Sequence, residues 1–275
     1  MSNHDNKRRP RHPVLRYHGG KWVLAKWIIS HFPEHRAYVE AYGGAGSVLL
    51  QKTPAKVEVY NDLNGEIVNL FRVLRDPALS AELIRQIELT PWSYDEWEES
   101  YKRTMGGVEA ARRLIACSFM SVGTDATCRQ GSKSGFRSYS KTQKIGTVPV
   151  QQWLTMPDAL HRIVERIQGR VIVENRDALK IMQQHDSLDT LHYVDPPYPK
   201  STRGDTGDDY RFEMTDDDHR KMASVLKELK GPVVISGYPC ELYDVELFPD
   251  WRREQRGAYA DGARKRTEVL WISTE

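Results

Sequence analysis

Four consecutive residues, Asp195-Pro196-Pro197-Tyr198, form the segment whose chemistry is easiest to interpret from the sequence. The two prolines have no N–H donor and fix their φ angles, so the turn is rigid and its carbonyl groups keep their direction. A carboxylate and a carbonyl held in this way can accept hydrogen bonds from an amino group, and the tyrosine offers a flat face for a planar ring. The tetrapeptide is therefore suited to hold the exocyclic amine of a nucleobase, although an ordinary proline-rich turn has the same composition.

A second group of residues indicates a cofactor that contains adenosine. Residues 42–46 read Tyr-Gly-Gly-Ala-Gly, a turn that lets a ligand approach the backbone closely. The turn is not a Walker loop, because no Gly-Lys-Ser/Thr follows, and its spacing is shorter than that of the full dinucleotide fingerprint. Asp62 follows the glycines by about 16–20 residues, where an acid accepts hydrogen bonds from the two hydroxyl groups of a ribose. The alternatives are an ordinary glycine turn and a helix N-cap at Asp62.

Hydrophobic stretches predict that both groups of residues follow β-strands. Strands are expected at 38–41, 57–60, 171–173, 191–194, 232–236 and 267–273, and helices at 47–50, 64–74, 178–184 and 215–229. This alternation predicts a doubly wound α/β sheet, in which ligands bind beyond the carboxyl ends of the strands. The last strand is expected to pair in a hairpin near an edge of the sheet.

Residues 90–165 interrupt the alternation of strands and helices. Ser93 and Glu96 have the spacing of a capping box, and apolar residues later in the segment have helical spacing. Residues 123–147 are poor in aliphatic side chains and rich in Gly, Ser, Thr, Lys and Arg, which predicts a loop or an irregular hairpin. We therefore expect a mostly helical insertion within the α/β domain.

The positive charge of the chain is concentrated in two segments. The formal net charge is +2, but residues 1–21 carry six basic side chains against one acid, and residues 101–150 carry nine against two. Two basic segments on an otherwise acidic protein favour a polyanionic partner on one side. A solvated surface of lysine and arginine is the alternative explanation.

The composition excludes several classes of protein. No apolar run approaches the ~18–20 residues of a membrane helix, and the polar, basic start of the chain lacks the apolar part of a secretory signal. The three cysteines form no Cys-x-x-Cys pair, so neither a disulfide framework nor a cysteine zinc site is expected. We expect a cytoplasmic protein without a metal, with residues 1–13 as a flexible basic tail.

Together these motifs resemble the Dam-type DNA adenine methylases over about residues 14–273. The segments that carry the resemblance, in the order of the family, are Tyr17-His18-Gly19-Gly20-Lys21, Tyr38-Val39-Glu40-Ala41-Tyr42-Gly43-Gly44-Ala45-Gly46, Asn61-Asp62-Leu63-Asn64, Glu174-Asn175-Arg176-Asp177, Asp195-Pro196-Pro197-Tyr198 and Arg264-Lys265-Arg266-Thr267-Glu268-Val269-Leu270. The chain departs from the family at Tyr17, where many members have Trp, and at Ala41, where many have Pro. Neither change removes a group that the chemistry needs.

The resemblance implies a class I methyltransferase, with a Rossmann-like sheet, that transfers methyl from S-adenosylmethionine to the N6 amino group of a flipped adenine in duplex DNA. Asp195, Pro196 and Tyr198 would be catalytic, with the flipped base stacked on the tyrosine. The implied cofactor-binding residues are Tyr17, Lys21, Tyr42, Gly44, Gly46, Asp62, Asp177 and Asp195. Among these, Lys21 would pair with a carboxylate, that of the methionine part of the cofactor.

The inserted segment is expected to recognise the DNA target. We divide the chain into the tail at 1–13, a catalytic domain at 14–88 and 166–275, and a target-recognition domain at 89–165. Within the insertion Arg129, Lys133, Arg137 and Lys141 are expected to contact DNA, lysines at phosphates and arginines at base edges. The expected assembly on duplex DNA is a monomer or a weak dimer.

Two alternatives come from different classes of function. One is an amino-methyltransferase that acts on cytosine N4 or on adenine in RNA, whose relatives more often carry Ser or Asn at the position of Asp195. The other is a DNA-binding regulator that has kept the fold and lost catalysis, against which the intact Lys21, Asp62, Asp195 and Tyr198 argue. The recognition sequence, and a role in a phage, a restriction–modification system or a housekeeping pathway, stay open at this point.

Overall fold

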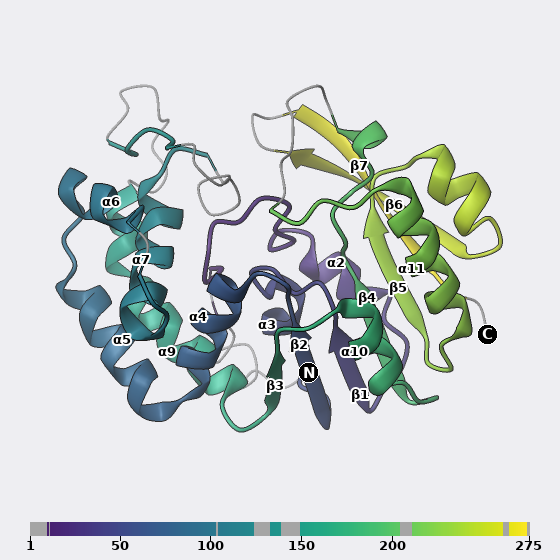
Figure 1. The fold of residues 1–275 in the computed structure, drawn as a ribbon, viewed down its shortest axis with the longest axis horizontal. Coiled ribbons are helices and arrows are strands. Elements are labelled where there is room, and N and C mark those ends of the chain that lie inside the picture. Colours follow the sequence, from purple (N-terminus) through teal and green to yellow (C-terminus); the bar gives the residue numbers. More distant parts are fainter. Residues whose placement is uncertain are drawn as a thin grey trace.

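A seven-stranded sheet forms the centre of the structure, which is a computed structural model that describes residues 10, 12–102, 104–123, 133–138, 149–203, 211–260 and 264–273 (Figure 1). Five neighbouring strands are parallel, the next strand runs antiparallel to them, and the edge strand pairs antiparallel with that one. In spatial order the strands are β3 (Val171–Glu174), β2 (Val57–Asn61), β1 (Ala37–Glu40), β4 (Thr190–Val194), β5 (Val233–Gly237), β7 (Arg264–Ile272) and β6 (Arg252–Ala260). The predicted doubly wound α/β sheet is confirmed.

The central strands are buried on both faces. Every residue of β4 and β5 is buried, as expected for parallel strands that helices cover on both sides. The apolar residues form one core on each face of the sheet. The helices that pack on the sheet are α2 (Ala25–Ser30), α3 (Ser47–Gln51), α4 (Gly65–Arg75), α10 (Ala178–Gln184) and α11 (Asp216–Glu228), with a 3-10 turn at Lys200–Thr202 and a π-helical turn at Leu242–Leu247.

Helix starts follow local capping residues in the sequence. The Asn64 side chain accepts a hydrogen bond from the backbone N–H of Glu66 and so caps α4, a role that we had considered for Asp62. Thr215 and Asp218 form a reciprocal capping box at the start of α11. Both caps lie beside the carboxyl ends of the strands, so they also fix the backbone around the site described below.

A group of helices is inserted between β2 and β3, on the left of Figure 1. These helices are α5 (Pro77–Leu89), α6 (Tyr94–Ser100), α7 (Gly107–Met120), α8 (Pro149–Leu154) and α9 (Met156–Ile167). Helix α7 packs against α4, α5 and α6, and its Ile115 shares one apolar core with Phe71 of α4 and Tyr60 of β2. The segment is thus continuous with the sheet core, and its division from the catalytic part at residues 89 and 165 stays a prediction.

Several elements were not predicted from the sequence, among them strand β6 and helix α5. Strand β6 has the sequence Arg-Arg-Glu-Gln-Arg-Gly-Ala-Tyr-Ala. Because it is rich in charged residues, it lacks the hydrophobic pattern from which strands are predicted. It occupies the edge of the sheet, where charged side chains discourage pairing with other chains. The predicted hairpin pairing of β7 near an edge of the sheet is confirmed, with β6 as the edge strand. Helix α5 begins at Asp76-Pro77, a cap followed by proline at the first position, which is a helix signal that we had not read.

In the part of the chain that the structure describes, no helix is both long enough and apolar enough to cross a membrane.

Candidate active site

A cavity of about 400 Å³ lies beyond the carboxyl ends of β1, β2 and β4. It brings together three predicted motifs that are far apart in the sequence: the glycine turn, the acidic motif and the Asp-Pro-Pro-Tyr motif. The predicted site residues that line it are Tyr17, Lys21, Tyr42, Gly44, Asp62, Asp177, Asp195 and Pro196. Gly46 and Tyr198 belong to the predicted set but do not line the cavity.

The glycine turn has conformations that only glycine accepts easily. Gly44 has φ of 47°, and a Cβ atom at Gly43 would lie 2.2 Å from the ring of Tyr60. The Tyr60 hydroxyl donates a hydrogen bond of 2.6 Å to the carbonyl oxygen of Gly44. Gly46 has φ of 63° and packs beside Phe71 at the start of α3. Gly46 therefore shapes the turn, and Gly44 forms part of the cavity wall.

The Asp62 carboxylate links the glycine turn to the end of β2. Its Oδ2 accepts a hydrogen bond from the backbone N–H of Gly44 at 2.8 Å, and its Oδ1 accepts one from that of Asn64 at 2.7 Å. Burial raises the pKa of Asp62, and the two backbone N–H groups oppose that shift. Each oxygen has a second lone pair, so the carboxylate can still accept hydrogen bonds from two hydroxyl groups.

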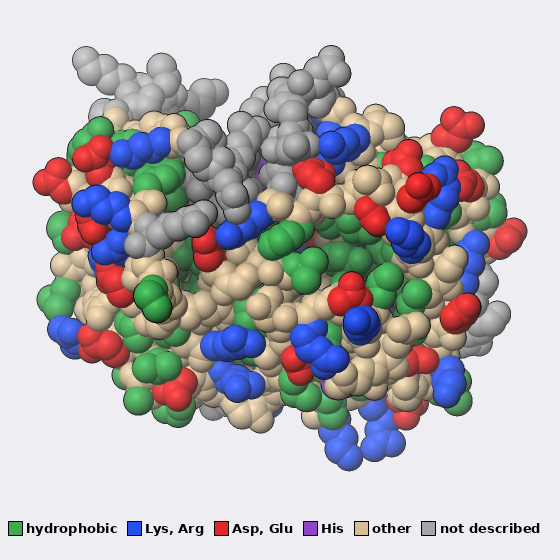
Figure 2. All heavy atoms as spheres, in the orientation of Figure 1, with side chains coloured by type: hydrophobic (Ala, Val, Ile, Leu, Met, Phe, Trp, Pro, Cys, Tyr) green, Lys and Arg blue, Asp and Glu red, His purple; other side chains and the backbone are tan. Residues whose placement is uncertain are grey.

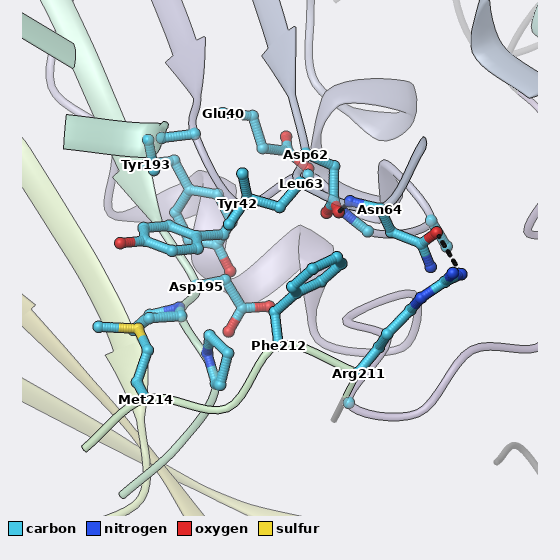
Figure 3. Close-up of a pocket in the computed structure, with 18 of the residues that line it drawn as sticks. Glu40, Tyr42, Asp62, Leu63, Asn64, Tyr193, Asp195, Arg211, Phe212 and Met214 are labelled. Atoms are coloured by element: carbon cyan, nitrogen blue, oxygen red, sulfur yellow. Dashed lines mark hydrogen bonds between the residues drawn. The ribbon is translucent and has the colours of Figure 1, made fainter. Parts of the chain in front are cut away.

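The neighbours of Asp62 fit a ligand with a nucleoside part. The Asn64 Nδ2 atom is buried without a hydrogen-bond partner in the described chain, and Asn64 lines the cavity. A buried donor without a partner is costly unless a ligand satisfies it. Leu63 and Phe212 are 46% and 44% exposed on the same cavity, so they offer apolar surface for a planar ring. Figure 3 shows both side chains beside Asp62.

The two oxygens of Asp195 have different surroundings. Oδ1 accepts a hydrogen bond of 2.8 Å from the Ser236 hydroxyl and lies 2.9 Å from Nζ of Lys21. The Tyr193 hydroxyl lies 2.9 Å from Oγ of Ser236, which extends the network to β4. Oδ2 has no hydrogen-bond partner among the described residues, and the carboxylate faces the cavity in Figure 3. One oxygen is thus held in place, and the other can accept a proton-donating ligand group.

Lys21 and Tyr198 lie in a buried group with Glu268. The Lys21 ammonium contacts Asp195 and donates a hydrogen bond of 2.7 Å to the carbonyl oxygen of Gly19. Its expected pairing with the methionine carboxylate of a cofactor stays a prediction, because the carboxylate beside it in the chain is that of Asp195. The Tyr198 ring is only 4% exposed, and its hydroxyl donates to Glu268 Oε1 at 2.5 Å. The face expected to stack on a base is buried here against Lys21 and Tyr238.

Sequence reasoning did not single out several residues of the site. Glu40 ends β1, lines the cavity and accepts hydrogen bonds from the Tyr38 hydroxyl and the Leu49 N–H, and burial raises its pKa to about 8. An acid at the end of the first buried strand was a signal that could have identified it. Ser236 and Glu268 lie on strands that only the folded sheet brings to the site.

Residues 211–214 form another wall of the cavity. Arg211 donates a hydrogen bond of 3.2 Å to Oδ1 of Asn64 (Figure 3). It also lies 3.0 Å from the Glu66 carboxylate. Arg203 and Glu213 form an ion pair with two hydrogen bonds. These contacts hold Phe212 between them on the cavity wall.

Two of the four predicted DNA-contacting residues can be placed. The Lys133 ammonium lies 2.8 Å from Glu98 and 4.7 Å from the ring centroid of Trp97, so α6 engages it within the chain. Arg137 is half-buried, its Nη1 donates to Gln152 Oε1 at 3.3 Å, and burial together with the charge of Arg16 lowers its pKa to about 10. Arg129 and Lys141 lie outside the described residues.

Charges of both signs are interspersed over the face drawn in Figure 2. Among the described residues, no group of three or more His, Cys, Asp and Glu side chains is placed to hold a metal ion.

Comparison with known proteins agrees with the arrangement of this site. The family described as D12 class N6 adenine-specific DNA methyltransferase matches residues 17–264. A DNA adenine methylase of Vibrio cholerae is 27% identical over 219 residues, which cover 78% of this chain and 75% of that protein. The type II methyltransferase M1.LlaDCHI of Lactococcus lactis is 24% identical over 276 residues, or 94% of each chain. A DNA adenine methylase of Escherichia coli strain K12 is 23% identical over 247 residues, or 86% of this chain and 82% of that protein.

The family match spans nearly the whole chain and includes the glycine turn, Asp62 and Asp195, which the fold gathers at one cavity. This chain belongs to the family of D12 class N6 adenine-specific DNA methyltransferases.

Proposed function

We propose that this adenine-specific DNA methyltransferase takes its methyl group from S-adenosylmethionine and transfers it to the N6 amine of an adenine flipped out of duplex DNA. One observation carries the proposal. Asp195 stands at the end of a buried central strand with Oδ1 held by Lys21 and Ser236, and with Oδ2 available at a cavity large enough for a small cofactor.

The residues around Asp62 are those that would hold the nucleoside part of the cofactor. Asp62 would accept hydrogen bonds from the ribose hydroxyls, and Nδ2 of Asn64 would donate to a ligand acceptor. Leu63 and Phe212 would contact a purine ring through their exposed apolar surface. Tyr17, Tyr42, Gly44 and Asp177 would complete the walls. When bound, the cofactor supplies a sulfonium methyl whose C–S bond breaks, leaving its electron pair on sulfur, as the lone pair of the adenine nitrogen forms the new C–N bond.

The chain itself would align the amine and compensate its developing charge. The adenine amine is a weak nucleophile because its lone pair is delocalised into the ring. Hydrogen bonds from the amine to Asp195 Oδ2 and to the Pro196 carbonyl would favour a pyramidal nitrogen with a localised lone pair. The nitrogen becomes positive as the bond forms, so a fixed carboxylate stabilises the transition state. One N–H proton then leaves the methylated nitrogen for solvent.

If a flipped base stacks on Tyr198, the buried ring of Tyr198 must first become exposed. Its ring would have to become accessible from its position against Lys21 and Tyr238 before a flipped adenine could stack on it. Phe212 already presents an exposed ring on the cavity wall. We therefore keep the stacking role of Tyr198 as a proposal that depends on this rearrangement.

We further propose that residues 89–165 recognise the target, while residues 14–88 and 166–275 carry the chemistry. Arg137 supports this proposal, since it is half-buried and no acid of the described chain pairs with it. We also propose that the protein acts on duplex DNA as a monomer or a weak dimer. Methylation of cytosine N4, methylation of RNA and a silent regulatory role are not favoured by the family and by the intact Asp195.

The test is to identify the methylated nucleoside. Purified protein is incubated with tritiated S-adenosylmethionine and either unmethylated duplex DNA or RNA, and the labelled nucleic acid is digested to nucleosides. The proposal expects the label in N6-methyldeoxyadenosine from DNA. Label in N4-methyldeoxycytidine or in RNA would replace the proposal by the corresponding alternative, and no label at all would favour the regulator.

A further inference from the structure

Glu268 on β7 completes a buried group of charges next to the catalytic carboxylate. Nζ of Lys21 lies 2.9 Å from Oδ1 of Asp195 and 3.8 Å from Oε1 of Glu268. The same Glu268 oxygen accepts the hydrogen bond of the Tyr198 hydroxyl, and Nζ of Lys21 lies 4.8 Å from the centroid of the Tyr198 ring. Glu268 therefore contacts Lys21, which pairs with Asp195, and Tyr198 of the same motif.

Because these charged groups are buried, their electrostatic interactions with one another are strong. Lys21 is 6% exposed and Glu268 is 3% exposed, so solvent screens their interactions weakly. The ammonium of Lys21 holds Asp195 in place, but it also cancels much of the negative charge that Asp195 would present to an amine that becomes positive. A second carboxylate beside the ammonium restores a net negative charge to the group.

We propose that Glu268 is a positioning residue for methyl transfer, which offsets the charge of Lys21 and holds the Tyr198 hydroxyl, so that Asp195 keeps its negative field at the target amine. This inference rests on the proposed role of Asp195 as acceptor for the adenine N6 amine. Glu268 lies on a strand beyond the cavity lining and would act through Lys21 and Tyr198 without touching the substrate.

The protonation of Glu268 gives the proposal a pH dependence. Burial raises the pKa of Glu268 to about 7; the charge of Lys21 and the Tyr198 hydrogen bond oppose the shift, and Asp195 adds to it. Two other groups lie near Glu268 and Tyr198. One is Tyr238, whose ring lies edge-on to that of Tyr198, and the other is Arg266, whose guanidinium lies 5.6 Å from the centroid of the Tyr238 ring. Glu40 ends β1, which pairs with β4, and interacts electrostatically with Asp195.

The direction of the pH dependence follows from the raised pKa of Glu268. Above about pH 7 Glu268 is ionised and offsets Lys21, and below that pH it is neutral and does not. The rate of methyl transfer should therefore fall as the pH falls through about 7.

The first experiment removes this charge and keeps the shape. Glu268→Gln retains an oxygen that can accept from Tyr198, and Glu254→Gln makes the same change on the neighbouring strand of the hairpin as a control. Single-turnover transfer of tritiated methyl to unmethylated plasmid DNA is measured from pH 6 to 8.5, and calorimetry gives the affinity for S-adenosylmethionine. For Glu268→Gln we expect a rate about tenfold lower at pH 8, below the ~10²–10³-fold effect of a group that touches the reacting atoms, with nearly unchanged cofactor affinity. The rise in rate around pH 7 should be lost, while Glu254→Gln should behave as the wild type.

A second pair of variants tests whether the effect passes through Lys21. Lys21→Met removes the charge that Glu268 is proposed to offset, so the loss caused by Glu268→Gln should be smaller in that background than in the wild type. If Glu268→Gln does not fold, Lys21→Met alone still tests the proposal, because it should weaken the rise in rate around pH 7.

Several results would overturn the inference. One is a Glu268→Gln rate within about twofold of an active wild type, and another is an equal loss of rate in Glu254→Gln. A third is a loss from Glu268→Gln that is as large in the Lys21→Met background as in the wild type. The last is an unchanged pH profile in whichever variant folds. A wild type that methylates no adenine would instead refute the proposed function, so the two failures can be told apart.

Discussion

In the proposed mechanism, methyl transfer depends on the different surroundings of the two oxygens of Asp195. Lys21 and Ser236 contact Oδ1, and Oδ2 is the oxygen that we propose for the target amine. The carboxylate is therefore fixed before substrate arrives, which reduces the reorganisation needed during the reaction. The glycine turn and Asp62 lie on the other side of the same cavity.

Asp195→Ala should abolish methyl transfer and leave the affinity for S-adenosylmethionine within about tenfold, or roughly 1.4 kcal/mol. The reason is that Asp195 is proposed to hold the amine, whereas Asp62 and Asn64 are proposed to hold the cofactor. Tritium transfer and calorimetry on the same preparation measure the two quantities, with the exposed Asp250→Ala as control. Appreciable turnover by Asp195→Ala would contradict the assignment.

Asp62→Ala should show the reverse pattern, with cofactor affinity weakened by about tenfold or more because the ribose acceptor is lost. The change also removes the acceptor of the Gly44 and Asn64 N–H groups, so thermal unfolding is recorded alongside calorimetry. An unchanged dissociation constant in a folded variant would show that the ribose is bound elsewhere.

The sequence could predict the residues whose type and local motif reveal their role. Asp195, Asp62 and Gly44 follow hydrophobic strands in short recognisable motifs, and the fold brings them together. Ser236 lies in no such motif, and Glu268 lies in the last motif without a role that the motif assigns, because the contacts of both arise from pairing between strands distant in sequence. The burial of Tyr198 likewise depends on contacts with Tyr238 and Glu268 that no local pattern reveals.

At the scale of elements, a buried ion group joins the inserted helices to the sheet. Glu58 at the start of β2 contacts Lys52 after α3 at 2.8 Å and Arg166 of α9 at 2.7 Å. Arg166 also donates a hydrogen bond of 2.7 Å to the carbonyl oxygen of Leu49. These contacts fix α9 against the sheet at the end opposite to the active site.

Glu58→Gln should destabilise the fold by about 3 kcal/mol or more, because it leaves Lys52 and Arg166 buried without a compensating charge. Burial raises the pKa of Glu58, but Arg166 and Lys52 outweigh it and hold the pKa below its ordinary value of 4.5. The stabilisation is therefore present above about pH 4.5 and is lost as the pH falls through the folded-state pKa.

Urea denaturation at several pH values measures this effect. The wild type should lose stability on acidification below pH 5 more steeply than Glu58→Gln. The exposed Glu82→Gln, which breaks a surface pair with Arg85, serves as control and should change little. A Glu58→Gln protein as stable as the wild type at pH 7 would show that the buried group does not hold α9.

Strand and helix patterns predicted most elements near the site but not the whole sheet. Buried strands such as β4 and β5 are read easily, because parallel strands covered on both faces are continuously apolar. Strand β6 was missed because an edge strand with one exposed side is rich in charge, and its pairing with β7 is a tertiary property.

At the scale of the whole molecule, the inserted helices and the β6–β7 hairpin stand on opposite sides of the carboxyl ends of the parallel strands (Figure 1). DNA that delivers an adenine to Asp195 would therefore pass close to both. Arg137 and Arg16 lie near each other at the end of α7: the backbone N–H of Arg137 donates to the Met120 carbonyl oxygen, and Arg16 Nη1 donates to the carbonyl oxygen of Ser121.

Two variants separate base reading from phosphate binding. Arg137→Ala should cost on the order of 1–3 kcal/mol on the preferred site and relax its sequence choice, because an arginine at a base edge carries sequence information. Lys141→Ala should weaken binding to all duplexes about equally and reduce the salt dependence by roughly one unit of slope. Salt titrations and the sequences of methylated sites distinguish the two variants. If DNA binding is unchanged in both, the residues that recognise the DNA sequence lie outside the insertion.

The central claim is tested most directly by mapping modified bases in living cells. Wild-type protein and Asp195→Ala are expressed in bacteria that lack adenine methylation, and their genomic DNA is sequenced by a method that detects N6-methyladenine. The account predicts N6-methyladenine at one defined sequence with the wild type and at none with Asp195→Ala. Absence of N6-methyladenine with folded wild-type protein, or equal methylation by the variant, would contradict it.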